Sequence, residues 1–414
     1  MTMGSTQLFS KLAIPFPAPL AMCIFLFSSL MILDKTSPKL AASASEFLMP
    51  GSNTLTTRWL ALFFVPSLIT LPIGMMLSPN ELIKLAVMVT VGFTTTLLST
   101  AFGVIFINNK ILETPSLPLP PISTSTTIIT PFTASEKAKS LKALLAFATA
   151  AIVKPNKMTH SLLLLSTTIH SYIFGSNLNP KIKKVFHPLV FTMAMTQFSC
   201  FLMAKLSPSS LGYGTISDVL RIYTTKSMTP LSFGAGDVLL FFLGPAVIAL
   251  SLQMFARREL MKKFLVQCVC GCLGSSLFSI FSTAWACNLL NVKTEAVRLS
   301  TLSRSITSPL AIAMTATLNG NPSLGVSLAV VTGLLGANFG TTLLDVFKVQ
   351  DPVARGLAIG SSSHGLGTAS ISTDPKEATA FPFSAISMTL VGVFSVCLVN
   401  VPIVARAILQ VIRK

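Results

Sequence analysis

Arg304 opens a polar stretch within otherwise apolar sequence, Arg304-Ser-Ile-Thr-Ser-Pro309. Its guanidinium can pair with a carboxylate through two parallel hydrogen bonds. The hydroxyls of Ser305, Thr307 and Ser308 can donate to the same anion. Pro309 has no N–H and frees a backbone carbonyl upstream. An arginine at the edge of an apolar block also serves as an interfacial anchor whose charged end reaches water, and both interpretations stay open.

A second polar stretch, from Arg355 to Ser370, is rich in small and hydroxyl residues and carries His364. A glycine inside a helix costs about 1 kcal/mol relative to alanine, and an unpaired polar group in an apolar setting costs a few kcal/mol. The sequence therefore predicts a broken helix that carries His364 as an anion donor or proton carrier, with a satisfied core histidine as the alternative. The other candidates in this stretch are Gly360, Ser362, Ser363, Gly365, Gly367 and Thr368.

Helix breaks are predicted at three places: Gly244-Pro245, residues 305–309 up to Pro309, and residues 360–368 from Gly360 onwards. Transporters use such breaks near the bilayer midplane, where the N-terminus of a half-helix presents unpaired N–H groups to an anion. Asn338 is a further polar candidate within an apolar window, with a helix-packing hydrogen bond as the alternative. The hydroxyls of Thr94 to Thr96 are expected to bond back to their own helix.

The composition identifies the setting of these stretches. The mean hydropathy is +0.74 and only 10% of the 414 residues are charged, against about 25% in soluble proteins. Several windows contain no charged residue, including those between Lys84 and Lys110, Lys263 and Lys293, and Arg304 and Asp345. Because about 20 apolar residues cross a bilayer, the chain is predicted to be an all-α polytopic membrane protein with about 9–12 transmembrane or half-membrane helices.

The uncharged windows predict the order of the elements. The predicted spans are 12–33, 59–77, 82–107, 160–177, 185–206, 238–255, 264–290, 324–344 and 383–405, with shorter pieces at 141–153 and 305–318. Residues 34–57 are predicted to form a polar loop. The segments 185–290 and 324–405 each consist of a span, a broken segment and a second span, which suggests an internal repeat.

Other classes of function are disfavoured by the sequence. The net charge of +17 is distributed in short loops, which indicates orientation by the positive-inside rule and contact with anionic lipid rather than nucleic-acid binding. Cys268, Cys270 and Cys272 lie in an apolar window without further ligands, so they are predicted to pack rather than to bind metal, and no cofactor is expected. No GxSxG, HExxH or P-loop motif is present, so the chain is not expected to be an enzyme. Residues 1–10 are uncharged and predict no cleavable presequence.

Several motifs together resemble the LrgB/CidB family over about residues 156–414. They are Phe242-Leu-Gly244, Arg304-Ser-Ile-Thr-Ser-Pro-Leu310, Val331-Thr-Gly-Leu-Leu-Gly-Ala-Asn-Phe339, Asp351-Pro-Val-Ala-Arg-Gly356 and Ser362-Ser-His-Gly-Leu-Gly-Thr-Ala369. The first half, with Phe63-Phe-Val-Pro66, resembles the holin-like partner LrgA. The resemblance implies an LrgA-like arm at 1–112, a Pro/Ser/Thr-rich linker at 113–140 and an LrgB-like transport domain at 141–414. Three features depart from the family pattern: Ser303, where the family has proline; His187-Pro188, where the bacterial pattern has Asn-Pro; and three predicted spans in the arm, where LrgA-like proteins usually have four.

A fused arrangement of this kind is similar to that of a plastid member of the family. It implies a secondary transporter, an antiporter of glycolate and glycerate in the plastid inner envelope that serves photorespiration. The partners would be a small carboxylate, the lipid bilayer and a coupled proton. The alternative is a holin-like or regulatory membrane protein controlling lysis or cell death. The sequence leaves the substrate, the coupling ion, the topology and the state of oligomerisation, monomer or homo-oligomer, open.

Overall fold

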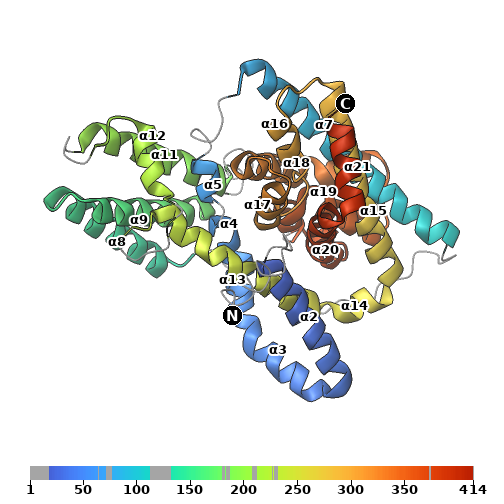
Figure 1. Cartoon of the computed structure of the whole chain (residues 1–414). Helices are drawn as coiled ribbons and strands as arrows, with labels where there is room; N and C mark the ends of the chain where they lie inside the picture. Colours follow the sequence, from blue (N-terminus) through green and yellow to red (C-terminus); the bar gives the residue numbers. More distant parts are fainter. Residues whose placement is uncertain are drawn as a thin grey trace. The chain divides into compact units, whose positions relative to one another are not determined.

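The computed structural model describes residues 18–63, 65–70, 77–111, 132–179, 182, 187–207, 212–225, 227, 232–372 and 374–413. Within these ranges the regular elements are all helical (Figure 1), and seven helices are long and apolar enough to cross a membrane. They are α2 (Ala18–Thr36), α7 (Pro79–Phe106), α11 (Pro188–Leu206), α13 (Ala235–Ala256), α15 (Leu265–Leu289), α18 (Pro322–Val346) and α20 (Phe381–Asn400). The chain is an all-α polytopic membrane protein, as its composition predicts.

The helices form two compact units that do not follow chain order. The first comprises Met1–Thr56, Leu77–Ile128 and Ala246–Lys414, and the second comprises Thr57–Met76 and Ile129–Pro245. Helix α7, from the first half of the chain, therefore belongs to the same unit as the whole C-terminal part. The proposed repeat segment 185–290 is divided between the units at Pro245, whereas 324–405 lies within one of them.

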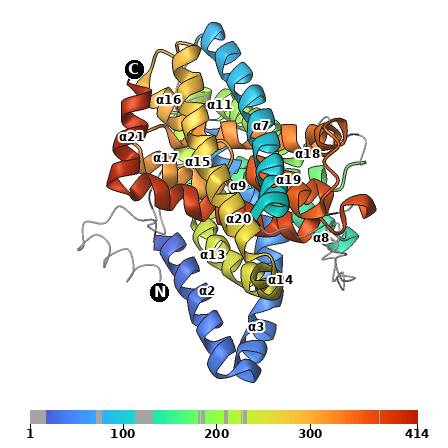
Figure 2. The ribbon, with the colours of Figure 1, turned by 90° about the vertical axis from the view of Figure 1, so that its right-hand side faces the viewer.

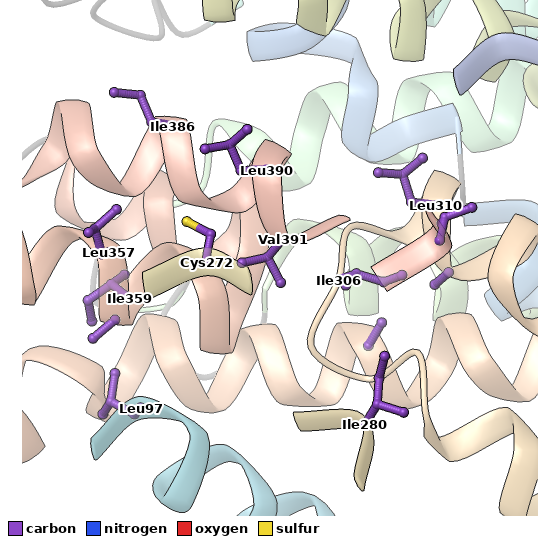
Figure 3. Close-up of a cluster of buried hydrophobic side chains, with 14 of the residues drawn as sticks. Leu97, Cys272, Ile280, Ile306, Leu310, Leu357, Ile359, Ile386, Leu390 and Val391 are labelled. Carbon is purple, nitrogen blue, oxygen red and sulfur yellow. The ribbon is translucent and has the colours of Figure 1, made fainter. Parts of the chain in front are cut away.

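The first unit is built around α7, α15, α18, α20 and α19 (Pro352–Ile371), which pack on one another. Helix α7 runs along α15, and α19 packs between α18 and α20 (Figure 2). Apolar side chains from all five helices form one core, and Leu97, Cys272, Leu357, Ile386 and Val391 are among those drawn in Figure 3. The other described helices of this unit are α2, the part of α13 after Pro245, α3 (Pro38–Asn53), α14 (Arg258–Lys263), α16 (Glu295–Thr301), α17 (Ser308–Thr317) and α21 (Pro402–Ile412), with a 3₁₀ turn at Pro375–Glu377 and a π-helical turn at Ile107–Ile111.

The second unit contains α4 (Leu60–Phe63), α5 (Val65–Ile69), α8 (Ala134–Val153), α9 (Lys157–Ser176), α11 and α12 (Ile216–Tyr223), preceded by a π-helical segment at Thr54–Trp59. Arg58 forms an ion pair of 2.9 Å with Glu136 and lies 4.4 Å from the ring centre of Phe132. Hydrogen bonds from the backbone N–H of Thr133, which has the larger effect, and from Arg58 hold the pKa of Glu136 below its ordinary value. The bonds between Thr133 and Glu136 also cap the start of α8.

Several sequence expectations are corrected by the helices. Residues 38–53 of the predicted polar loop form helix α3. Helix α8 begins at Ala134, so it includes the last residues of the predicted linker, whose residues 113–131 lie outside the described ranges. Helix α9 matches the predicted span 160–177 in position, but it is not among the seven apolar helices because it carries many Ser, Thr and His side chains.

Helix α13 runs through Gly244 and Pro245 without a break, so the break predicted there is wrong. A proline inside a helix removes one N–H···O bond but does not always end the helix. Ser78 caps the start of α7, because its hydroxyl accepts from Glu81 N at 3.3 Å.

Glycines allow the helices of the first unit to approach closely. A Cβ placed on Gly360 of α19 would collide with the backbone of Ser384 and the hydroxyl of Ser387 on α20. Small residues at helix contacts are the usual means by which membrane helices gain packing energy. The contact leaves no space for even one methyl group.

We predict that Gly360→Ala lowers the free energy of unfolding by about 1–3 kcal/mol, because overpacking forces the helix backbones apart. Gly274→Ala is the matched control: it replaces a glycine of α15 whose added Cβ would meet nothing within 4 Å, and it should leave stability unchanged or raise it by up to about 1 kcal/mol. Thermal unfolding of both variants in the same detergent measures the difference. Equal midpoints would contradict the α19–α20 contact.

Candidate functional site

Arg304 lies in the turn between α16 and α17 and is completely buried in the first unit. Its Nε donates to Thr283 Oγ1 on α15 at 2.9 Å, and its Nη2 donates to Thr96 Oγ1 on α7 at 3.0 Å. Nη1 is buried and has no partner among the described residues. The burial of Arg304 within this unit excludes its interpretation as an interfacial anchor, since a fully buried side chain does not reach water.

The guanidinium keeps most of its hydrogen-bonding capacity. It carries five N–H donors, of which the two threonines take one each. The ion pairs formed by the described residues do not include Arg304. A buried charge without a counter-charge is strongly unfavourable, so this side chain is suited to an anion that accepts from Nη1 and the second hydrogen of Nη2.

Two hydroxyls just after Arg304 are also buried without a partner in the described part of the chain. They are Thr307 Oγ1 and Ser308 Oγ, at the start of α17. Ser305, in contrast, is paired with Ser279 of α15 at 2.8 Å, so its hydroxyl is already used in packing. Arg304, Thr307 and Ser308 thus bring three unsatisfied donor groups into five consecutive residues.

Local sequence explains this arrangement. Pro309 occupies the first turn of α17, where its missing N–H costs nothing. Thr307 O accepts from the N–H groups of Leu310 and Ala311, both at 2.9 Å, which starts the helix. Because Thr307 does not cap α17 with its own side chain, its hydroxyl stays available at a helix end that carries partial positive charge.

His364 interrupts α19 as a residue of non-helical geometry, with φ 45° and ψ −142°. Its Nε2 lies 2.8 Å from Ala329 O on α18. Since a carbonyl oxygen only accepts, Nε2 carries the hydrogen. The predicted break in this stretch therefore falls at His364, four residues after Gly360, which lies inside regular helix. A backbone of this kind is costly for any residue except glycine.

The hydroxyls beside His364 are bonded within the protein. Ser362 and Ser363 donate to carbonyls four residues earlier, at 2.7 and 2.8 Å, and Thr368 pairs with Ser384 Oγ on α20 at 2.8 Å. In this structure these side chains hold the interrupted helix together. Gly367 makes room for Ser363, whereas a Cβ on Gly365 would only reach Met388 Sδ at 4.0 Å.

Helix α7 lies beside both Arg304 and the interrupted part of α19. An added Cβ on Gly92 would lie 2.7 Å from Nη2 of Arg304. An added Cβ on Gly336 of α18 would collide with Ser363 and lie 3.4 Å from Cε2 of Phe93, the next residue of α7. Arg304 and the Ser363–His364 region therefore border the same turn of α7.

Other sequence candidates lie elsewhere. Asn338 is on an exposed face of α18 and donates to Leu334 O of its own helix at 2.8 Å. Arg355 forms ion pairs with Asp345, at 2.8 Å, and with Glu377. Cys268 and Cys272 are buried in the apolar core, while Cys270 is exposed.

Sequence reasoning missed Gly92, Thr96 and Thr283 as neighbours of Arg304. The hydroxyl of Thr96 does bond back to Gly92 O, at 2.7 Å, as predicted for this run of threonines. Thr94 and Thr95 make the same backbone bonds and have no contact with Arg304. Only the packing of α7 on α15 distinguishes Thr96 from Thr94 and Thr95, so the sequence alone gave no sign that Thr96 contacts Arg304.

Comparisons with known proteins bear on the same region. A family model described as the LrgB-like family matches residues 168–405. The chain is 34% identical over 416 aligned residues to plastidal glycolate/glycerate translocator 1, chloroplastic, of Arabidopsis thaliana, with 98% of this chain and 78% of the relative covered. It is 27% identical over 166 residues to antiholin-like protein LrgB of Bacillus subtilis (strain 168), with 40% of this chain and 71% of the relative covered. No solved protein structure matches the chain.

We predict an inverted order of helix propensity at position 364. The free energy of unfolding of His364→Gly should exceed that of His364→Ala by about 1 kcal/mol or more, because only glycine adopts this backbone without strain. His364→Gly should therefore unfold at a higher temperature. Ser361, in the regular part of α19, is the control, and there alanine should be more stable than glycine by about 1 kcal/mol. The usual order at both positions would contradict the strained conformation of His364.

Proposed function

The chain belongs to the LrgB-like family, and we propose that it is a secondary transporter that exchanges small 2-hydroxy monocarboxylates, of the glycolate and glycerate class, across an organellar inner membrane. The observation that carries the proposal is the set of buried donors without partners at Arg304, Thr307 and Ser308. The chain is not an enzyme, in keeping with relatives named as a translocator and as an antiholin-like protein.

The donor set fits a carboxylate in number and charge. Three guanidinium N–H groups remain after Thr96 and Thr283 are satisfied. A carboxylate accepts two of them in parallel, and hydrogen bonds between charged groups are shorter and stronger than neutral ones. The start of α17 adds partial positive charge on the same side. A neutral ligand would leave the Arg304 charge uncompensated.

The 2-hydroxyl of the proposed substrate would be recognised by protein groups that both accept and donate hydrogen bonds. Thr307 and Ser308 each offer both functions. His364 adds an imidazole that donates through Nε2 to Ala329 O, which leaves Nδ1 as the acceptor in the neutral ring. In the proposed mechanism His364 binds the 2-hydroxyl or carries a coupled proton, and the strained backbone holds the imidazole in place.

The proposed location is the plastid inner envelope. It follows from the plant relative, whose name describes a plastidal, chloroplastic translocator of glycolate and glycerate. Because the alignment covers 98% of this chain, it includes α7 as well as the region with Arg304. The second candidate function is a holin-like or regulatory membrane protein, favoured by the antiholin-like relative from Bacillus subtilis. That function needs an oligomeric pore and no saturable substrate.

We predict saturable counterflow of labelled glycolate against internal glycerate in proteoliposomes containing the purified chain. Arg304→Ala and His364→Ala should each reduce the exchange rate at least about 100-fold, since each removes a group proposed to contact the ligand. Arg221→Ala and His170→Ala, which change an exposed arginine of α12 and a histidine of α9 in the second unit, are the matched controls and should exchange normally. Wild-type rates in both site variants would refute the site, and a leak that does not saturate would favour the pore.

We predict that the site distinguishes substrates by the 2-hydroxyl. Unlabelled glycolate, glycerate and lactate should compete for counterflow, whereas pyruvate, which has a carbonyl in place of the hydroxyl, should compete at least about tenfold less well. A site that hydrogen-bonds a hydroxyl rejects analogues that lack it, because its own polar groups are then left unpaired. Inhibition constants for the four acids in one preparation make the comparison. Equal competition by pyruvate would show that only the carboxylate is recognised.

A further inference from the structure

We propose that α7 forms one wall of the anion site and that Thr96 is a positioning residue that sets the orientation of the Arg304 guanidinium. This inference rests on the proposed function, because it concerns the same arginine. It adds a contribution from a segment that lies outside the family match at 168–405. The first half of the chain would then be part of the binding machinery of the C-terminal part.

Polar contacts along α7 show how firmly it is built into the first unit. Near its start, Lys84 Nζ donates to Asn291 O at 2.6 Å. Further along, Thr100 Oγ1 and Ser275 Oγ of α15 form a hydrogen bond of 2.8 Å. Just beyond its end, Asn108 Nδ2 donates to Asp351 Oδ2 at 2.9 Å. These contacts and the apolar packing of α7 on α15 place α7 within the first unit, and Thr96 is the threonine of α7 whose hydroxyl reaches Arg304.

The hydrogen bonds of Thr96 determine what it offers to Arg304. Its hydroxyl hydrogen is used on Gly92 O at 2.7 Å, so the oxygen can only accept from Nη2 of Arg304. Thr283 accepts from Nε of the same guanidinium. Two fixed acceptors on different helices define the plane and direction of the rigid group. Nη1 is thereby left for the ligand.

Gly92 supports the same arrangement through its size. It lies one helical turn before Thr96, and a Cβ there would be 2.7 Å from Cζ and Nη2 of Arg304. The guanidinium therefore lies flat against the backbone of α7. A side chain at position 92 would push the charge away from Thr96, so both residues of this turn determine where the charge lies.

Threonine variants of the full-length chain in proteoliposomes test the proposal. We expect Thr96→Val, which keeps the shape and removes the acceptor, to raise the KM for glycolate about tenfold with little change in maximal rate. Thr96→Ser should restore the KM. Thr95→Val, on the exposed face of the same turn, and Thr100→Val, which removes a buried hydrogen bond to Ser275, should leave the KM unchanged. Equal effects of Thr96→Val and Thr100→Val on KM would overturn the positioning role.

A double-mutant cycle on thermal unfolding tests the same contact without transport. The shifts in midpoint caused by Thr96→Val and Arg304→Lys should be non-additive, because a lysine cannot keep both threonine contacts. The cycle of Thr100→Val with Arg304→Lys should be additive. Additive shifts for Thr96 would overturn the inference even if transport were intact. Non-additive shifts in a chain without saturable counterflow would support the positioning of Arg304 by α7 and reject the proposed function.

Discussion

The buried charge of Arg304 is the constraint on which the rest of the first unit depends. An ionised group inside a membrane protein is tolerated only where neighbouring groups solvate it or where a counter-charge arrives. Thr283 and Thr96 accept from Nε and Nη2 of the guanidinium, and the start of α17 adds positive partial charge. The threonine oxygens stabilise the cation but do not neutralise it, and the helix start favours an anion beside it.

Close packing is what makes this burial possible. Gly92 lets the guanidinium lie against the backbone of α7, Gly336 lets Ser363 approach α18, and Gly360 brings α19 onto α20. A bulkier side chain at any of these positions would separate helices whose contacts fix the polar groups. The strained backbone of His364 persists in the same way, because the hydrogen bond to Ala329 O and the packing of Gly333 hold the ring.

Much of the fold could be predicted from sequence because membrane helices obey simple rules. Uncharged windows located α7, α15, α18 and α20 to within a few residues, since length and apolarity decide which segments can cross a bilayer. Arg304, Thr307 and Ser308 could be selected because a charge is rare beside such windows and the two hydroxyls follow it within four residues. The break at Gly244-Pro245 could not be judged, because a neighbouring element decides whether a helix continues through proline. The contact of Thr96 with Arg304 and the exposed position of Asn338 could not be foreseen for the same reason, since only tertiary packing determines which face of a helix is buried.

The position of both interrupted regions on one turn of α7 has a consequence for transport. Gly92 contacts Arg304, and the adjacent Phe93 borders the contact between Gly336 and Ser363. Under the proposed function, a ligand that displaced the guanidinium would change its hydrogen bond to Thr96, which lies one helical turn from Gly92 and Phe93. Packed helices have discrete arrangements and deform little within each of them. A shift of α7 would therefore alter the surroundings of Arg304 and His364 together, so that binding of the carboxylate and rearrangement of the interrupted helix α19 would be coupled through one element.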